Sequence, residues 1–243
     1  MSSPWIDVVG ASDLPPDRLE RVVHVGQVST DALDASQREG PQAYLVAQGS
    51  ATEELPVHFH TVDQFQYFSG GGGTVGTHVV ADGIVHYSDA LTPYGPLRPG
   101  PGGMSYLTLR GVHDGGVRYM PGARTELADL LESSARPASA RRNVAVVLTD
   151  PVTGDGWDHL VDEPDGLRIS VVELPPGRQA APLSIRAGGA YAVVVRGSTS
   201  AVDGTLGAPA MRWLAAGEVL EVTAGADGAR VAALQFPTPA DRN

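Results

Sequence analysis

Cysteine is absent from the 243-residue sequence, and basic residues are scarce. Without thiols, the chain can form no disulfide bond, no thiolate metal ligand and no cysteine nucleophile. Its 17 Lys and Arg residues are outnumbered by 28 Asp and Glu residues, which gives a formal net charge of −11 at pH 7. Because a nucleic-acid-binding surface has to be basic, we expect no nucleic-acid partner.

Long apolar segments are also missing. No run approaches the roughly 20 apolar residues that cross a bilayer. The first residues lack the basic region and apolar stretch of a secretory signal peptide. Neither a Gly-x-x-x-x-Gly-Lys phosphate loop nor a Gly-x-Ser-x-Gly nucleophile turn occurs. These absences favour a cytoplasmic protein with no membrane partner.

Glycine and proline are abundant instead, at 30 and 19 residues. This content suits short strands joined by tight turns and argues against a helical bundle. The four glycines at 70–73 are predicted to form a hairpin turn. Strands are predicted at 43–47, 57–60, 64–68, 74–80, 104–110, 143–148, 167–174, 191–195, 219–222 and 231–236. The sequence therefore predicts an all-β protein.

One helix is expected near the middle of the chain. Thr125 is the predicted N-cap, and Leu127, Leu130 and Leu131 lie on one helical face. The segment that follows is rich in Ser, Ala and Pro and has the composition of a linker. We therefore predict a first domain at 1–133, a linker at 134–142 and a second domain at 143–243.

The two halves show signs of internal duplication. Residues 56–71 align with 182–197, so that a proline opens and a glycine closes each segment at the same spacing. Residues 82–85 likewise align with 216–219. Two equivalent units of short strands favour small barrels or jelly rolls, because closure removes exposed strand edges.

His58 and His60 form the most distinctive polar pattern. Residues i and i+2 of a strand point to one face about 7 Å apart, so two such imidazoles can share one metal ion. Two ordinary hydrogen-bonded histidines would give the same pattern by chance.

The residues around this pair resemble the first cupin motif, which is His-x-His, three residues, Glu, six residues and Gly. Residues 58–71 keep every spacing, with Gln64 in the position of the Glu. The second motif matches 83–98 in length, with Tyr94 in place of its His and Arg98 in place of its Asn. The resemblance covers most of 43–120 and, more faintly, about 143–237. It implies a bicupin, with two tandem cupin-type β-barrels (double-stranded β-helix or jelly roll) and one short helix between them.

Metal-binding cupins use three His and one Glu, so the resemblance implies a divalent metal ion, with Fe(II) favoured and Zn, Ni or Mn as alternatives. Gln64 can offer a carbonyl oxygen, whereas Tyr94 can ligate only as a phenolate. His86 and His78 are candidates for a third nitrogen ligand, although a histidine hydrogen-bonded within the sheet fits His86 equally well. The expected metal ligands are His58, His60, Gln64 and His86.

Further polar residues are expected to line the same cavity. Gln66 shares a strand face with Gln64 and can orient a ligand. Arg110 can pair with a substrate carboxylate, although a solvated residue at the rim is the simpler interpretation. The expected catalytic residues are Gln64, Tyr94, Gln66 and Arg110. The second domain is expected to be degenerate, because its ligand positions carry Ser184, Arg186, Ala190 and Gly228.

Two functions follow from the resemblance. The first is a metal-dependent cupin enzyme that acts on a small organic molecule in the N-terminal barrel, by oxygenase or by isomerase or lyase chemistry. The second is a metal-free, non-catalytic bicupin that binds a small ligand, which the replacement of two of the four metal ligands favours. Because cupins often dimerise, a homodimer is the expected assembly.

Overall fold

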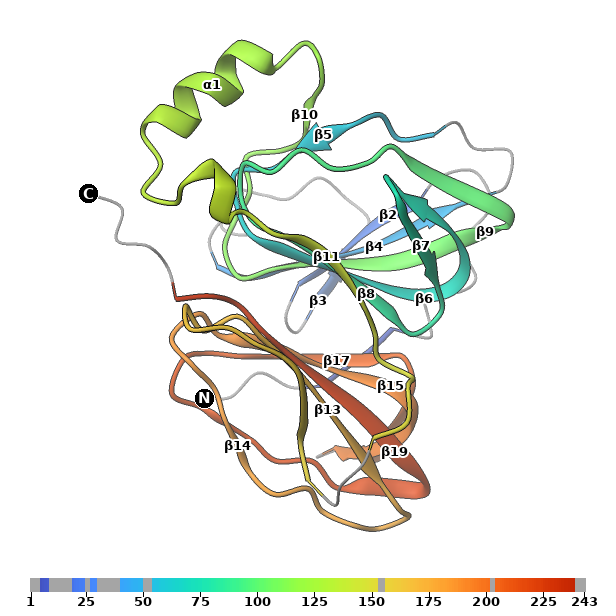
Figure 1. Ribbon diagram of the computed structural model, residues 1–243. Helices are drawn as coiled ribbons and strands as arrows, with labels where there is room; N and C mark the ends of the chain where they lie inside the picture. Colours follow the sequence, from blue (N-terminus) through green and yellow to red (C-terminus); the bar gives the residue numbers. More distant parts are fainter. Residues whose placement is uncertain are drawn as a thin grey trace. The chain divides into compact units, whose positions relative to one another are not determined.

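The computed structural model describes residues 5–8, 19–24, 27–29, 40–49, 54–152, 156–201 and 204–238. These residues are mostly β-sheet with one short α-helix, as expected (Figure 1). The chain divides into two compact units. We call them the N-terminal unit, which ends at residue 147, and the C-terminal unit, which comprises 148–238 together with residues 27–28 and residues 5–8, the last including the short strand β1 (Ile6–Asp7).

The N-terminal unit is built on an eight-stranded sheet with the order β11-β8-β6-β9-β4-β2-β3, in which β7 also pairs with β6. A separate two-stranded sheet, β5–β10, lies next to α1 (Figure 1). The bounds are β2 (Leu19–His24), β3 (Gln27–Ser29), β4 (Gln42–Gln48), β5 (His58–Phe59), β6 (Gln64–Val75), β7 (His78–Ala81), β8 (Ile84–Ser88), β9 (Leu97–Arg110), β10 (Arg118–Tyr119), α1 (Arg124–Glu132), a 3-10 turn (Ala138–Ala140) and β11 (Asn143–Val147).

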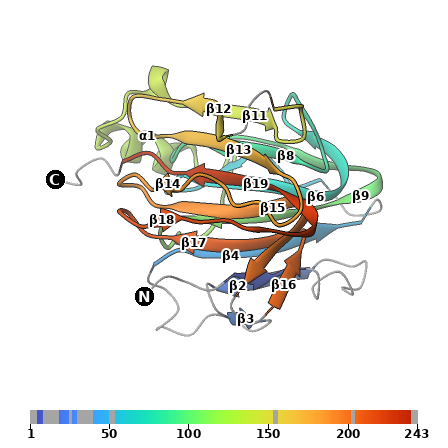
Figure 2. The same ribbon diagram turned by 90° about the horizontal axis from the view of Figure 1, so that it is seen from below.

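The C-terminal unit has a seven-stranded sheet with the order β1-β17-β15-β19-β13-β12, in which β16 also pairs with β15. Figure 2 shows its strands β13, β19, β15 and β17 side by side. A two-stranded sheet, β14–β18, accompanies it. The bounds are β12 (Asp158–Asp162), β13 (Arg168–Leu174), β14 (Leu183–Ser184), β15 (Ala190–Ala201), β16 (Gly204–Gly207), β17 (Ala210–Leu214), β18 (Val219–Leu220) and β19 (Ala224–Gln235).

The expected closure of each half into a barrel is not seen among the described strands. Each unit instead combines one large open sheet with one two-stranded sheet. An apolar cluster fills the C-terminal unit with many small side chains, among them Ala190, Ala192, Ala210 and Ala233. The corresponding space in the N-terminal unit is partly polar, because its buried residues include histidine, glutamine and arginine. The buried polar side chains that could form a functional site therefore lie in the N-terminal unit.

The four glycines at 70–73 do not form the predicted hairpin turn. They lie inside β6, which runs on to Val75 and has register shifts against β9 at Phe68/Gly70 and Gly71/Gly73. A glycine run is a strong local signal for a turn, but here it permits bulges where two strands approach closely. The chain reverses later, between β6 and β7 around Gly76.

The glycine at 71 has a counterpart in the C-terminal unit, at 197. Gly71 and Gly197 have φ values of 65° and 73°. A Cβ at Gly71 would lie 2.2 Å from the carbonyl oxygen of Gly103, and one at Gly197 would lie 2.2 Å from that of Gly228. The same backbone contact therefore occurs once in each unit, in agreement with the alignment of 56–71 with 182–197.

Two other parts of the expected alignment were wrong. Ser184 pairs with Val219 as His58 pairs with Tyr94, so Val219 rather than Gly228 occupies the fourth ligand position of the C-terminal unit. The match of 82–85 with 216–219 also fails, because the first segment leads into β8 beside β6, whereas the second leads into β18 beside β14.

The start of the helix also differs from expectation. Helix α1 begins at Arg124 after the N-cap Ala123, which makes no side-chain cap bond, so Thr125 is not the cap. The preceding turn explains this, since the Ala123 N–H donates to the carbonyl of Tyr119. The predicted apolar face is confirmed: Leu127 is buried, and Leu130 and Leu131 pack against the same cluster. Within the described residues, no helix is both long and apolar enough to span a membrane.

The segment 134–142, expected to be a linker, is tied to the N-terminal unit by ion pairs. Arg136 pairs with the buried Asp89, and Arg142 donates to the same carboxylate from its backbone N–H at 2.6 Å and its Nε at 3.0 Å. Strand β11 then pairs with β8 along its whole length. The strand expected to open the second domain thus belongs to the sheet of the first unit.

Candidate functional site

The backbone brings His58 and Tyr94 together at the edge of the N-terminal unit. The N–H of His58 donates to the carbonyl of Tyr94 at 3.1 Å, and the N–H of Tyr94 donates back at 2.9 Å. The two ring centroids are 4.5 Å apart. His60 lies on the same side as His58, with a ring-centroid distance of 5.3 Å, whereas Phe59 is buried in the apolar cluster under α1. Strand alternation therefore places both imidazoles as the sequence predicts.

One directed chain of hydrogen bonds passes through the expected ligand positions. His58 donates from Nδ1 to the carbonyl oxygen of Pro56 at 2.7 Å. The other ring nitrogen of a neutral His58 must then accept, so the Tyr94 hydroxyl donates to Nε2 at 2.9 Å. The amide of Gln64 donates to the Tyr94 oxygen, and Arg110 Nε donates to Gln64 Oε1 at 3.2 Å.

His60 is oriented by a carboxylate that the sequence analysis missed. Its Nδ1 donates to Asp114 Oδ2 at 2.7 Å. The other carboxylate oxygen accepts from the backbone N–H and the hydroxyl of Thr61, at 3.2 Å and 3.0 Å. Arg110 Nη1 lies 3.5 Å from Asp114, and Arg110 Nη2 lies 3.2 Å from Nδ1 and 3.3 Å from Nε2 of His60. We call His58, His60, Gln64, Tyr94, Arg110 and Asp114 the interior polar cluster.

Burial controls the charges of this cluster. Burial lowers the pKa of His58 to about 4 and also lowers the pKa of His60. Burial by itself raises the pKa of Asp114, but the hydrogen bond from His60 and the charge of Arg110 outweigh it and bring that pKa below its usual range. Burial raises the pKa of the Tyr94 hydroxyl. At neutral pH, the cluster therefore contains neutral imidazoles, a neutral phenol and one guanidinium–carboxylate pair.

His86 and Gln66 are paired with each other beside the interior polar cluster, because the ring of His86 lies 5.3 Å from that of Tyr94. His86 Nδ1 lies 3.0 Å from Gln66 Oε1, and its Nε2 lies 2.6 Å from Asn143 Oδ1. Both nitrogens of the expected third metal ligand are thus already engaged. The ring of His78 lies 5.7 Å from that of His86, and His78 is only partly buried, so it stands with His86 and not with His58.

The burial of Arg110 and the position of the turn that follows it differ most from what the sequence predicted. Arg110 is 8% exposed, so it is an interior residue and not a solvated rim residue. The turn that carries Asp114 is fixed by the buried Gln42, which accepts from the Asp114 N–H at 3.2 Å and contacts His113. Asp114 follows Arg110 by four residues in an irregular segment, where this spacing does not bring charges together as it does on a helix, so no sequence pattern pointed to it.

The interior polar cluster meets the requirements of a metal site only in part. A histidine that ligates a metal usually donates its other nitrogen to a carbonyl or carboxylate, as His58 and His60 do. Their remaining nitrogens, however, face the Tyr94 hydroxyl and the Arg110 guanidinium. No group of three or more His, Asp or Glu residues in the described part of the chain is placed to hold a metal ion. This arrangement does not fit a bound divalent metal.

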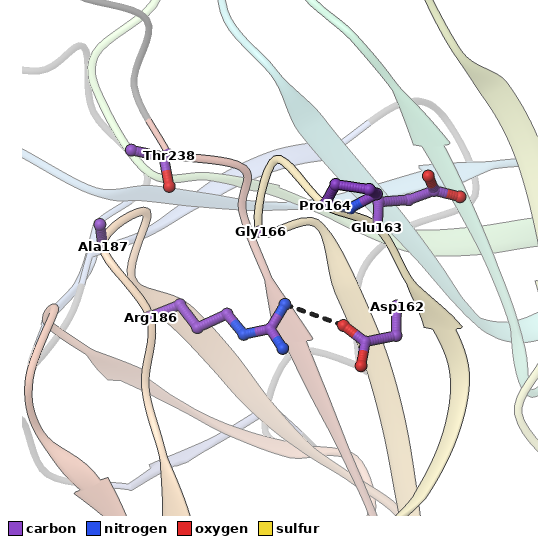
Figure 3. Close-up of a pocket in the computed structure, with 7 residues that line it drawn as sticks. All are labelled: Asp162, Glu163, Pro164, Gly166, Arg186, Ala187 and Thr238. Atoms are coloured by element: carbon purple, nitrogen blue, oxygen red, sulfur yellow. Dashed lines mark hydrogen bonds and ion pairs between the residues drawn. The ribbon is translucent and has the colours of Figure 1, made fainter.

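The C-terminal unit carries a pocket of about 620 Å³ at its surface (Figure 3). Its lining includes Arg186, which stands at a ligand position of the second half. The guanidinium of Arg186 points toward Asp162, and the two pair at 2.8 Å; Arg168 also pairs with that carboxylate. The lining also includes Glu163, so Arg186 is outnumbered by two acidic residues and the pocket has no excess positive charge for an anionic ligand.

Comparisons with solved structures identify the fold. A cupin 2 conserved barrel domain protein from Leptotrichia buccalis aligns over 97% of this chain and 98% of its own, with 11% identity and a TM-score of 0.55. The fold is that of the cupins. Two other cupin-fold neighbours are oxalate decarboxylase from Bacillus subtilis (12% identity, 99% of this chain, 78% of that chain, TM-score 0.61) and the pirin YhhW from Escherichia coli in complex with nickel(II) (10% identity, 91% of this chain, 100% of that chain, TM-score 0.55).

The comparisons by sequence add nothing to this assignment. No family model matches the chain, and no curated protein matches it. The low identities to the cupin structures establish the fold alone. Because one fold can host many different functions, the fold leaves the reaction open.

Proposed function

We propose that this chain is a bicupin whose N-terminal unit binds a small organic acid at the interior polar cluster and exchanges a proton with it. The observation that carries the proposal is the buried arrangement of Asp114, His60 and Arg110. A neutral imidazole whose Nδ1–H is held by a carboxylate leaves Nε2 as a general base. A guanidinium beside that nitrogen is the natural partner of a carboxylate.

The contacts define how the acid would bind. Arg110 Nη2 now lies 3.2 Å from His60 Nδ1 and 3.3 Å from His60 Nε2, of which only Nε2 is free to accept. A carboxylate is the stronger acceptor for a guanidinium, so it would replace the imidazole as the partner of Nη2. The bound molecule would then lie next to His60 Nε2, which can take a proton from it. The resulting imidazolium is stabilised by the Asp114 carboxylate on Nδ1.

An approach to this position is provided by the β5–β10 strands. Tyr119, on β10, is 41% exposed, and its ring lies 5.8 Å from that of His58. Tyr119 is therefore in contact with solvent and lies next to His58. The likeness to oxalate decarboxylase, a cupin named for a reaction of a small organic acid, supports this class of ligand.

Thermal unfolding with a panel of small mono- and dicarboxylates tests the proposal. Binding at 100 times the dissociation constant adds about 2.7 kcal/mol to the free energy of unfolding. We expect at least one acid to raise the melting temperature of the wild type by several degrees, and its neutral amide analogue to have no effect. The shift should vanish in Arg110→Met and persist in Arg98→Met, whose side chain is 55% exposed. Equal shifts in the two variants, or with acid and amide, would contradict the proposal.

A second candidate is the metal-dependent cupin enzyme, with Fe(II), Zn, Ni or Mn and with oxygenase, isomerase or lyase chemistry. The placement of His58 Nδ1 on a carbonyl and of His60 Nδ1 on a carboxylate favours it, as does the nickel(II)-bound pirin neighbour. A third, non-catalytic ligand-binding role differs from our proposal only in lacking proton transfer. The homodimer and the cytoplasmic location remain predictions.

A further inference from the structure

We propose that the guanidinium of Arg110 replaces the metal cation in the N-terminal unit, and that Arg110 and Tyr94 together keep this unit free of metal. The inference concerns the same cluster as the proposed function, but it does not depend on the organic acid. It begins from the four motif positions, 58, 60, 64 and 94. Their side chains converge as metal ligands would, yet each of them makes its contact with another member of the set or with Arg110.

Arg110 reaches the centre of this set from β9. Its Nε donates to Gln64 Oε1 at 3.2 Å, its Nη2 lies 3.3 Å from His60 Nε2, and its Nη1 lies 3.5 Å from Asp114 Oδ2. The guanidinium thus contacts two of the side chains that would have to ligate a metal. A divalent cation placed among them would be repelled at close range in a buried site, where water screens the charges poorly.

Tyr94 removes a further ligand. Its hydroxyl donates to His58 Nε2 at 2.9 Å, so the lone pair that would bind a metal is already used.

Gln64 explains why a carboxylate is missing from this position. Its carbonyl oxygen accepts from Arg110 while its amide group donates to the Tyr94 oxygen. A carboxylate can only accept, so Glu at 64 would compete with His58 for the proton of Tyr94. The side chains that stand in this unit instead of a metal and its ligands are therefore mutually consistent. Gln64 links the other two, because its amide donates to Tyr94 and its carbonyl oxygen accepts from Arg110.

Metal titration of untagged protein tests the inference. Wild type treated with EDTA and titrated with Co²⁺ should bind less than about 0.1 equivalent, measured by elemental analysis and by the visible absorption bands of bound Co²⁺. The variant Gln64→Glu/Tyr94→His/Arg110→Met restores two ligands and removes the cation, and should bind close to one equivalent. The double variant Gln64→Glu/Tyr94→His, which retains Arg110, should bind Co²⁺ at least tenfold more weakly than the triple variant.

Each variant is first checked for cooperative unfolding by circular dichroism. If the triple variant does not fold, the single variant Arg110→Met serves instead, and its Co²⁺ affinity should exceed that of the wild type at least tenfold. Near-stoichiometric Co²⁺ in the wild type, lost in His58→Gln, would overturn the inference. An Arg110→Met variant whose affinity for Co²⁺ equals that of the wild type would also overturn it. Because the carboxylate titration uses metal-free protein, failure of the proposed function would be seen separately.

Discussion

At the residue scale, Asp114 supplies the counter-charge of the interior polar cluster. Its carboxylate orients His60, accepts from Thr61 and compensates Arg110. The spacing of His58, His60, Gln64 and Tyr94 predicted their convergence, because strand alternation and motif length determine it. Asp114 could not be predicted in the same way, since it lies 54 residues from His60 in an irregular segment.

We expect Asp114→Asn to lower the free energy of unfolding by about 3–5 kcal/mol, because it leaves the Arg110 guanidinium buried without its counter-charge. Urea unfolding followed by fluorescence measures this loss. Glu54→Gln is the matched control, because it removes the carboxylate of an exposed pair with Arg98. Exposed pairs contribute about 0–1 kcal/mol. A loss in Asp114→Asn no larger than that of the control would show that the cluster does not depend on this charge.

At the scale of elements, the β6 bulge shows where local signals mislead. The glycines at 70–73 have the composition of a turn, but pairing with β9 keeps them in a strand. The alignment of the two halves was a better guide, because it placed Gly71 and Gly197 at equivalent positions before their shared backbone contact was visible. The short strand β1 could not be predicted, since its partner β17 lies about 200 residues away in sequence.

Gly71→Ala and Gly197→Ala should each destabilise their own unit by about 2–4 kcal/mol or prevent soluble expression, because the new Cβ would meet a carbonyl oxygen at 2.2 Å in a residue with positive φ. Gly102→Ala and Gly207→Ala are the controls, because nothing lies within 4 Å of a Cβ at either position. Thermal unfolding of all four variants provides the comparison. Controls as unstable as the test variants would refute the interpretation of the bulge.

For the whole molecule, the buried histidines make stability depend on pH. Burial lowers the pKa of His58 and of His86 to about 4, below the value of about 6.5 for an unfolded histidine. Between these values the unfolded chain binds more protons than the folded chain. The stabilisation is therefore fully present above pH 6.5 and is lost as the pH falls toward 4.

We expect the free energy of unfolding to fall by up to about 3 kcal/mol for each of these histidines between pH 6.5 and 4. Chemical denaturation across this range should show a shallower decline in His86→Gln than in the wild type. The exposed His159, changed to Gln, is the control and should leave the slope unaltered. Burial raises the pKa of Asp63, which acts in the opposite sense, but Asp63 is present in all three proteins and cancels in the comparison. Parallel slopes for wild type and His86→Gln would contradict the assignment.

The all-β class and the correspondence of Gly71 with Gly197 could be predicted from the sequence, whereas the division between the two units could not. The sequence of 143–147 predicts a strand but does not indicate which sheet it joins. Only its pairing with β8 assigns it to the N-terminal unit. The composition of 134–142 is that of a linker, and only Asp89, some fifty residues earlier, reveals why two of its arginines are fixed.

This pairing of β11 with β8 has a practical consequence for recombining the protein. A chimaera joined in the Ser- and Pro-rich stretch would take its final sheet strand from the foreign parent and would leave Asp89 without Arg136 and Arg142. A crossover placed just after Val147 retains both. A junction in the segment with the composition of a linker would therefore remove both ion pairs of Asp89 and a strand of the N-terminal sheet.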